Sequence, residues 1–363
     1  MTFRLTFVFF LVWSGLKCSH SFIYPFSSRS PSQIVVEAAR SGAPSPTSRS
    51  DAPSPAARSG AVNMILKSKF KELCELRECI KRGEVVDMED KSHEDFYECM
   101  VSRFFTLHVA AEYNNKVKTG FLLGLPNPDI MSLTLRNCGA KCIVVHMDYK
   151  SGGVSVKEFA RFTREQQRAK SWNPGPIAVV WHDFVIDPLQ IELAASQGAS
   201  AVTISPDLNT DADVSQHITL AQSLGVEPVV LVRSARQVDA ALAAGARSFV
   251  MQGMDVQEQI ALRQMYPVPA DGALSDVVWG ARLRASGEFS SIEEIDAAWA
   301  LRDGGFNFIW PTSDSLYGMG MEDILSTVSA MKAKAAKELL SPRQYLMERK
   351  REGATEHLGD LAM

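Results

Sequence analysis

The feature of this sequence that most constrains its fold is a regular alternation of short apolar runs, rich in β-branched residues, with helical segments. Eight such runs start roughly 20 to 35 residues apart. They are 106–113, 141–147, 176–183, 201–205, 228–233, 248–252, 276–280 and 306–310. Strand, helix and strand in succession indicate parallel pairing with right-handed crossovers. Eight units predict a closed (β/α)8 TIM barrel, an α/β fold, rather than an open doubly wound sheet.

An extra helix is predicted before the barrel. Apolar residues recur at helical spacing over 64–81, among charged residues. Gly-Ala pairs such as Gly198-Ala199 and Gly245-Ala246 come just before several runs, where each helix must stop and the chain must turn back. A barrel of this kind carries its chemistry on the loops that follow the strands.

The amino-terminal region has the composition of a targeting sequence. The apolar run 5–16 is shorter than the ~20 residues of a membrane span, so it predicts a signal peptide over 1–21. The segment 22–62 is rich in Ser, Pro, Ala and Arg and resembles a transit peptide. Together they predict import into the stroma of a plastid of secondary origin, the alternative being secretion. No transmembrane segment is expected in the mature chain.

The remaining chain divides into a barrel with its helical extension over 63–320 and a helical tail over 321–363. The formal net charge is -4, which gives no broad cationic surface for nucleic acid. The six cysteines form no CxxC pair, and no metal or cofactor is expected. The tail is a candidate docking arm for a plastid protein complex.

Several short sequence motifs resemble those of indole-3-glycerol-phosphate synthase, the ring-closing decarboxylase of tryptophan biosynthesis. The stretch 178–191, which contains Trp181-His182-Asp183-Phe184, looks like the family's Lys-Asp-Phe-Ile-Ile-Asp segment. Further similar motifs are Ala111-Glu112-Tyr113 and the turns that precede the fifth and sixth apolar runs. The resemblance implies a barrel preceded by an extra helix, and a carboxy-lyase that needs a cationic acid, a carboxylate base and a phosphate cradle.

When the functional residues that the resemblance implies are carried over one by one, the set of catalytic residues is incomplete. The candidate catalytic residues are Glu112 as base and His182 in place of the family's lysine, provided that a neighbouring carboxylate raises the pKa of His182. The candidate substrate-binding residues are Lys116, Lys118 and Gln252. The family positions that have lost their functional residue are Asn114, Leu231, Met254, Trp279 and Gly280. Glu112, His182, Leu231, Gln252 and Trp279 are all expected to point into one mouth at the carboxyl ends of the strands.

These residues predict a barrel that has lost efficient ring-closing activity and acts as a binding or scaffold subunit, with a phosphorylated small molecule as a possible ligand. One alternative is a divergent but active indole-3-glycerol-phosphate synthase. Another is a lyase or isomerase for a different phosphorylated metabolite. Glu112 and Asp148 could also pair as two carboxylates across the mouth.

Overall fold

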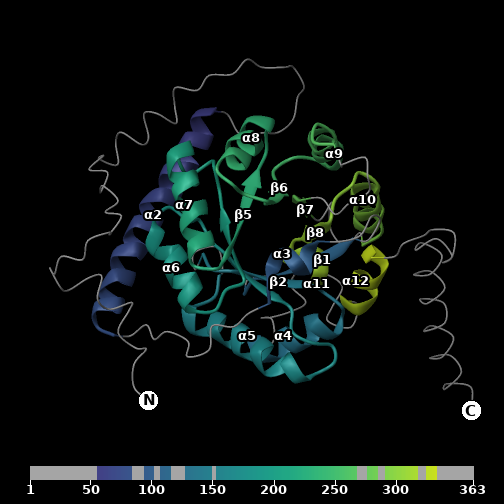
Figure 1. Ribbon diagram of the computed structural model, residues 1–363, viewed down its shortest axis with the longest axis horizontal. Coiled ribbons are helices and arrows are strands. Elements are labelled where there is room, and N and C mark those ends of the chain that lie inside the picture. Colours follow the sequence, from purple (N-terminus) through teal and green to yellow (C-terminus); the bar gives the residue numbers. More distant parts are fainter. Residues whose placement is uncertain are drawn as a thin grey trace, which may run out of the picture. The chain divides into compact units, whose positions relative to one another are not determined.

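Eight parallel strands close into a barrel in the computed structural model, in the order β1 to β8 (Figure 1). The structure describes residues 55–83, 94–101, 107–115, 127–148, 153–267, 276–284, 291–317 and 324–332. The strands are β1 (His108–Tyr113), β2 (Cys142–His146), β3 (Ala178–His182), β4 (Ala201–Ile204), β5 (Glu227–Val232), β6 (Ser248–Met251), β7 (Val278–Leu283) and β8 (Phe308–Pro311). The predicted TIM barrel is confirmed, since each apolar run contains one strand or most of one, except that the run 276–280 contains only the first half of β7.

Helices surround the barrel, in most cases one between consecutive strands (Figure 1). They are α2 (Pro55–Lys81), α3 (Phe96–Met100), α4 (Pro128–Asn137), α5 (Val156–Arg168), the 3-10 turn η3 (Ala169–Ser171), α6 (Pro188–Ser196), α7 (Asp211–Ser223), α8 (Ala235–Ala243), α9 (Val256–Gln264), α10 (Ser291–Asp303), α11 (Ser313–Tyr317) and α12 (Ile324–Lys332).

Local signals in the sequence set the ends of these helices. Asp187 and Gln190 form a capping box at the start of α6, in which the side-chain oxygen of each residue accepts a hydrogen bond from the backbone N–H of the other. At the other end of the α6 and α8 units, Gly198 and Gly245 have φ angles of 73° and 88°. Only glycine adopts this left-handed backbone at no steric cost, so the predicted Gly-Ala turns end their helices as expected.

Apolar side chains fill two layers. Alternate strand residues face outward and pack under the helices, while the others fill the barrel interior. Helix α3 closes the amino end of the interior, where Phe96 and Met100 are buried. The rings of Phe96 and Phe308 meet edge to face, with 5.9 Å between centroids. Because the amino end is packed shut, access to the interior is from the carboxyl ends of the strands.

The extra helix α2 begins earlier than predicted. It starts at Pro55, inside the segment predicted to be transit-peptide-like, so the described fold extends upstream of the expected boundary at 63. Arg77 of α2 pairs with Asp187 at the start of α6, with 2.6 Å between Nη2 and Oδ2, which places the two helices side by side. The predicted signal peptide over 1–21 and most of the 22–62 segment lie outside the described residues.

The chain beyond the barrel is described only as far as α12. Lys332 at its end donates from Nζ to the carbonyl oxygen of Gly139 over 2.8 Å. The rest of the predicted tail lies outside the described residues. In the part of the chain that the structure describes, no helix is long and apolar enough to cross a bilayer.

One half-buried histidine at the start of β1 predicts a pH dependence of stability. Burial, reinforced by Lys141 and Lys332, lowers the pKa of His108 to about 4. The unfolded chain protonates this histidine near its ordinary pKa of ~6.5, so the free energy of unfolding falls as the pH drops from about 6.5 to about 4. The slope contributed is about 1.4 kcal/mol per pH unit. Urea unfolding of the wild type and of His108→Asn across this range should show a shallower slope for the variant, and equal slopes would contradict the assignment.

Candidate functional site

The carboxyl ends of the strands form a mouth lined by polar and aromatic side chains. Glu112 of β1 and His182 of β3 both lie there and are buried, with 5% and 9% of their surfaces exposed. Leu231 of β5 belongs to the cluster that fills the barrel interior. These three predicted mouth residues therefore face the interior, and a leucine stands where the parent reaction needs a carboxylate.

The carboxylate of Glu112 is held by three donors from the last two strands and the turn that follows. Arg282 approaches Oε2 with Nη2 at 2.5 Å, and Trp310 donates to the same oxygen from Nε1 at 2.9 Å. Ser313 donates to Oε1 over 3.2 Å. The hydroxyl of Tyr317 donates to the backbone oxygen of Glu112 over 2.7 Å. Both carboxylate oxygens are thus engaged, which is an arrangement that holds a buried charge in place.

Aromatic rings and the Arg282 guanidinium pack across the centre of the mouth. The guanidinium lies over the Trp310 ring at 4.2 Å from the centroid. The Trp310 ring meets His182 edge to face at 4.6 Å, and His182 lies 5.1 Å from His146 on β2. His146 and His182 occupy paired positions on neighbouring strands. His146, Arg282 and Trp310 were not among the mouth residues predicted from the sequence.

His182 does not have the raised pKa that an acid role would require. Burial lowers its pKa well below the ordinary value, and His146, Arg282 and Lys69 lower it further. Its Nδ1 lies 3.0 Å from the hydroxyl oxygen of Thr203. The condition for an acid role, a nearby carboxylate that raises this pKa, is not met, because burial lowers the pKa and the cations Arg282 and Lys69 lower it further. His182 is a neutral imidazole at neutral pH.

The placement of Trp279 in the mouth is also wrong. Strand β7 continues to Leu283, so Trp279 lies near its beginning and faces outward. The Trp279 ring stacks on Phe249 at 5.1 Å and contacts Tyr266 at 5.3 Å in the layer beneath the helices. Gly280 does face inward, where a Cβ atom would overlap the Phe308 ring. The inward residue at the mouth end of β7 is Arg282.

The remaining predicted positions are at the rim or undescribed. Gln252 follows β6, two residues after the interior residue Val250, so the strand alternation directs it inward. Met254 is half-buried and packs against the outer layer instead. Asn114, just past β1, is also half-buried. Lys116 and Lys118 lie outside the described residues, so their predicted contact with a phosphate stays a prediction.

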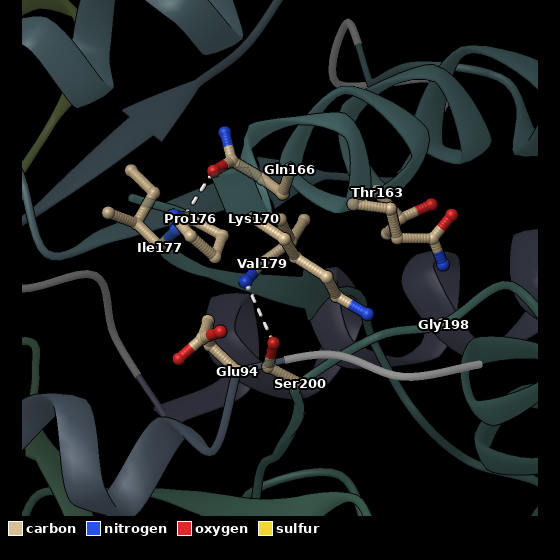
Figure 2. Close-up of a pocket in the computed structure, with 10 residues that line it drawn as sticks. Glu94, Thr163, Gln166, Lys170, Pro176, Ile177, Val179, Gly198 and Ser200 are labelled. Atoms are coloured by element: carbon tan, nitrogen blue, oxygen red, sulfur yellow. Dashed lines mark hydrogen bonds between the residues drawn. The ribbon is translucent and has the colours of Figure 1, made fainter. Parts of the chain in front are cut away.

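A hollow at each end of the barrel is lined by described residues, and the two differ in size. The one at the amino end, between α5 and the starts of β3 and β4, has a volume of about 10 Å³, room for about one water (Figure 2). The other has a volume of about 430 Å³ and lies beside the carboxyl end of β7, between the starts of α9 and α10. Glu294, in its wall, is buried, and burial raises the pKa of its carboxyl to about 7. The second hollow has the size of a small-molecule site.

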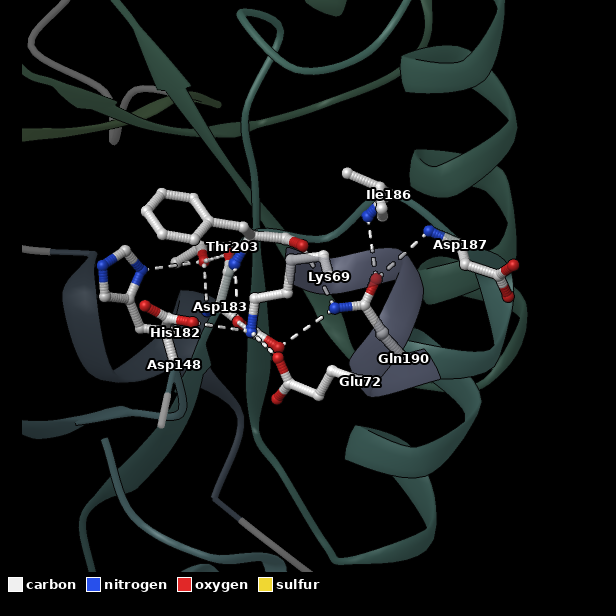
Figure 3. Close-up of polar contacts among 10 residues, drawn as sticks. Lys69, Glu72, Asp148, His182, Asp183, Ile186, Asp187, Gln190 and Thr203 are labelled. Carbon is white, nitrogen blue, oxygen red and sulfur yellow. Dashed lines mark hydrogen bonds and ion pairs between the residues drawn. The ribbon is translucent and has the colours of Figure 1, made fainter. Parts of the chain in front are cut away.

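A buried lysine from α2 reaches the same end of the barrel. Lys69 has 1% of its side chain exposed and lies against Asp148 after β2 and Asp183 after β3 (Figure 3). Since Asp148 is bound to Lys69 and Glu112 to Arg282, each of these carboxylates has its own cation. This geometry does not support the alternative of a Glu112–Asp148 pair. In the described part of the chain, no three His, Cys, Asp or Glu side chains are grouped so as to hold a metal ion.

Comparison with known proteins gives a consistent relationship. The family model described as indole-3-glycerol phosphate synthase matches residues 62–254. A protein of that name from Roseiflexus castenholzii is 35% identical over 139 residues, covering 38% of this chain and 50% of its own length. Another from Carboxydothermus hydrogenoformans is 32% identical over 81 residues, covering 22% of this chain and 31% of its own. The chain thus spans between about a third and a half of the length of these relatives.

A solved structure of a 4-hydroxy-2-oxoglutarate aldolase is similar at a TM-score of 0.45 and 15% identity, covering 66% of this chain and 98% of that one. That similarity is too low to bear on the site. The family model, in contrast, covers more than half of the sequence and includes Glu112, His182 and Leu231. Together with the closed eight-stranded barrel and the preceding helix, this match shows that the chain belongs to the indole-3-glycerol phosphate synthase family.

Proposed function

We propose that this protein is a plastid member of the family that does not carry out the ring-closing decarboxylation efficiently and instead serves as a binding or scaffold subunit. The observation that carries the proposal is the state of Glu112 and His182. Glu112 has both carboxylate oxygens engaged by Arg282, Trp310 and Ser313, and His182 is a buried neutral imidazole.

The parent reaction requires a cationic group that can release a proton during ring closure. Among the described mouth residues, the cations are Arg282 and Lys69. A guanidinium does not release its proton in a protein, and Lys69 is enclosed by carboxylates. Leu231 cannot move a proton either. Removing a single electrostatic donor typically lowers a rate by ~10²–10³, and here several are replaced together.

The alternative of a divergent active synthase is favoured by one observation. Glu112 and His182 do lie in the same mouth, where a base and an acid would be needed. For activity, a substrate would have to displace Arg282 from Glu112. In addition, the His182 imidazole would have to become protonated, or another proton donor would have to take its place. That requirement makes the non-catalytic function the better supported of the two.

The plastid location and the partner complex rest on the sequence. The proposed signal peptide over 1–21 and the Arg-rich, acid-poor segment 22–62 support plastid import. The charged tail beyond α12 supports docking to a stromal protein complex. A phosphorylated small molecule remains the proposed ligand class, with Lys116 and Lys118 as its proposed contacts.

We expect the purified full chain to form no measurable indole-3-glycerol phosphate from the carboxyphenylamino deoxyribulose phosphate substrate of the family. His182→Lys should be equally inactive, since Leu231 and the Arg282–Glu112 pair would remain. The measurement is the fluorescence of the indole product, with an active synthase as positive control. Robust turnover by the unmodified chain that is abolished by Glu112→Gln would establish the divergent enzyme instead.

A further inference from the structure

The N-terminal helix α2 contributes a fully buried cation to the barrel. Nζ of Lys69 lies 2.6 Å from Oδ1 of Asp183, 3.1 Å from Oδ1 of Asp148 and 2.9 Å from Oε2 of Glu72 (Figure 3). Its side chain is 1% exposed, whereas Lys71 on the same helix is 77% exposed. A buried ammonium without counterions would be costly, so these contacts are required for Lys69 to stay inside.

The two aspartates belong to different strand ends and are held on their other sides as well. Asp183 directly follows β3, and its carboxylate also accepts from Nε2 of Gln190 at 3.0 Å and from the backbone N–H of Phe184 at 2.8 Å. Asp148 comes after β2, and 7% of its side chain is exposed. Lys69 therefore joins the end of β2 to the end of β3 through ion pairs, beside the ring contact of His146 with His182.

The connection continues to the imidazole in the mouth. The backbone N–H of Asp183 donates to the hydroxyl oxygen of Thr203 over 3.3 Å, and the same oxygen lies 3.0 Å from Nδ1 of His182. Figure 3 shows Lys69, Asp183, Thr203 and His182 as one continuous set of contacts. A shift of the Asp183 backbone would thus move the partner that orients His182.

The charge of Lys69 is secure in this position. Burial alone would lower its pKa, but Asp183 and Glu72 outweigh that effect and raise the pKa above the ordinary value. A second ion pair, between Arg77 and Asp187, also joins helix α2 to the barrel. The Arg77 side chain is 47% exposed, and exposed ion pairs contribute little to the free energy of unfolding. Lys69 is the buried polar anchor of the helix.

We propose that Lys69 is a positioning residue: from helix α2, outside the (β/α)8 unit, it holds Asp148 and Asp183 together and thereby fixes the β2–β3 side of the mouth and the orientation of His182. The mouth is complete only while α2 is docked. This inference does not depend on whether the barrel catalyses a reaction.

The test is Lys69→Met in the full chain, with Lys71→Met as the matched control on the exposed face of the same helix. Hydrogen exchange should become faster by about tenfold or more at Asp148, Asp183 and Phe184, while the buried starts of β2 and β3 keep their wild-type rates. Lys71→Met should match the wild type throughout.

A second measurement separates positioning from general support of the fold. The titratable or charged groups that act on His182 are His146, Arg282 and Lys69. Removing the lysine takes away one of the groups that lower the pKa of His182, so NMR titration of the His182 ring should show a higher pKa than in the wild type. A variant that is less stable overall but has the wild-type His182 pKa and uniform exchange would overturn the proposal.

A milder variant keeps the test decisive where Lys69→Met does not fold. Asp148→Asn retains the Lys69–Asp183 contact, so it should fold and speed exchange at the end of β2 but not at Asp183. Unchanged exchange at the end of β2 in Asp148→Asn would also overturn the proposal, because Lys69 would then not be holding that strand end.

Discussion

Replacing Arg282 with methionine should lower the free energy of unfolding by about 3–5 kcal/mol. The substitution removes the cation that lies 2.5 Å from the Glu112 carboxylate and leaves that charge buried. Glu112 has 6% of its side chain exposed, so water cannot replace the guanidinium without opening the mouth. Urea unfolding followed by circular dichroism measures the change. Arg284→Met is the control, because Arg284 is exposed two residues further along, and we expect its effect to stay within about 0.5 kcal/mol.

The double variant Arg282→Met, Glu112→Gln tests the physical reason for this loss. If the cost comes from an unpaired buried charge, neutralising Glu112 should recover a large part of it, since a neutral amide can still accept from Trp310 and Ser313. A double variant no more stable than Arg282→Met alone would show that the lost packing of the guanidinium on Trp310, and not the charge, is what matters.

Replacing Trp279 with alanine should cost a similar amount, about 3–5 kcal/mol. The ring is 2% exposed and stacks between β7 and the surrounding helices, so its removal leaves a cavity next to Phe249 and Tyr266. Trp172→Ala is the matched control, because Trp172 is 51% exposed. We expect that control to lose about 1 kcal/mol or less. The measurement is the urea midpoint together with the slope of each transition.

The Trp279 variant also tests where the residue lies. An outward Trp279 changes stability and leaves the mouth intact, so the NMR signals of His146 and His182 should keep their positions. Large shifts of both histidine signals, with little loss of stability, would instead put Trp279 in the mouth.

The barrel could be predicted from the sequence because each of its units is locally encoded. A buried parallel strand appears as a short apolar run, and its helix ends at a glycine such as Gly198 or Gly245. The mouth positions of Glu112, His182 and Leu231 could be predicted from the sequence motifs shared with the family, which lie within the matched range 62–254. Both kinds of signal are present in the order of residues along the chain.

The end of β7 could not be predicted in the same way. The apolar run stops at Gly280 because Arg282 is charged, and a charge normally marks the end of a buried strand. Arg282 nonetheless has only 16% of its side chain exposed, because it pairs with Glu112, which lies 170 residues earlier in the chain. The strand also falls beyond the range that the family model matches. A long-range ion pair of this kind leaves no trace in local periodicity.

Lys69 was missed for a different reason. It stands among Lys67 and Lys71 and looks like one of several surface lysines. One signal could have distinguished it: Ile65 and Leu73 lie four residues before and after it, so Lys69 is on the apolar stripe of the helix. A lysine on that stripe needs buried counterions, and the two aspartates that supply them are in distant segments.

The contact between α2 and α6 has a consequence for the order in which the chain folds during synthesis. Arg77 and Asp187 are 110 residues apart, so at a typical elongation rate of ~5–20 residues per second the helix is made about 5–20 s before its partner. Throughout that interval the apolar stripe that later buries Leu73 has no surface to cover it. The first of the described helices to be translated is thus among the last to reach its native contacts, and a chaperone that recognises amphipathic helices has its longest access there.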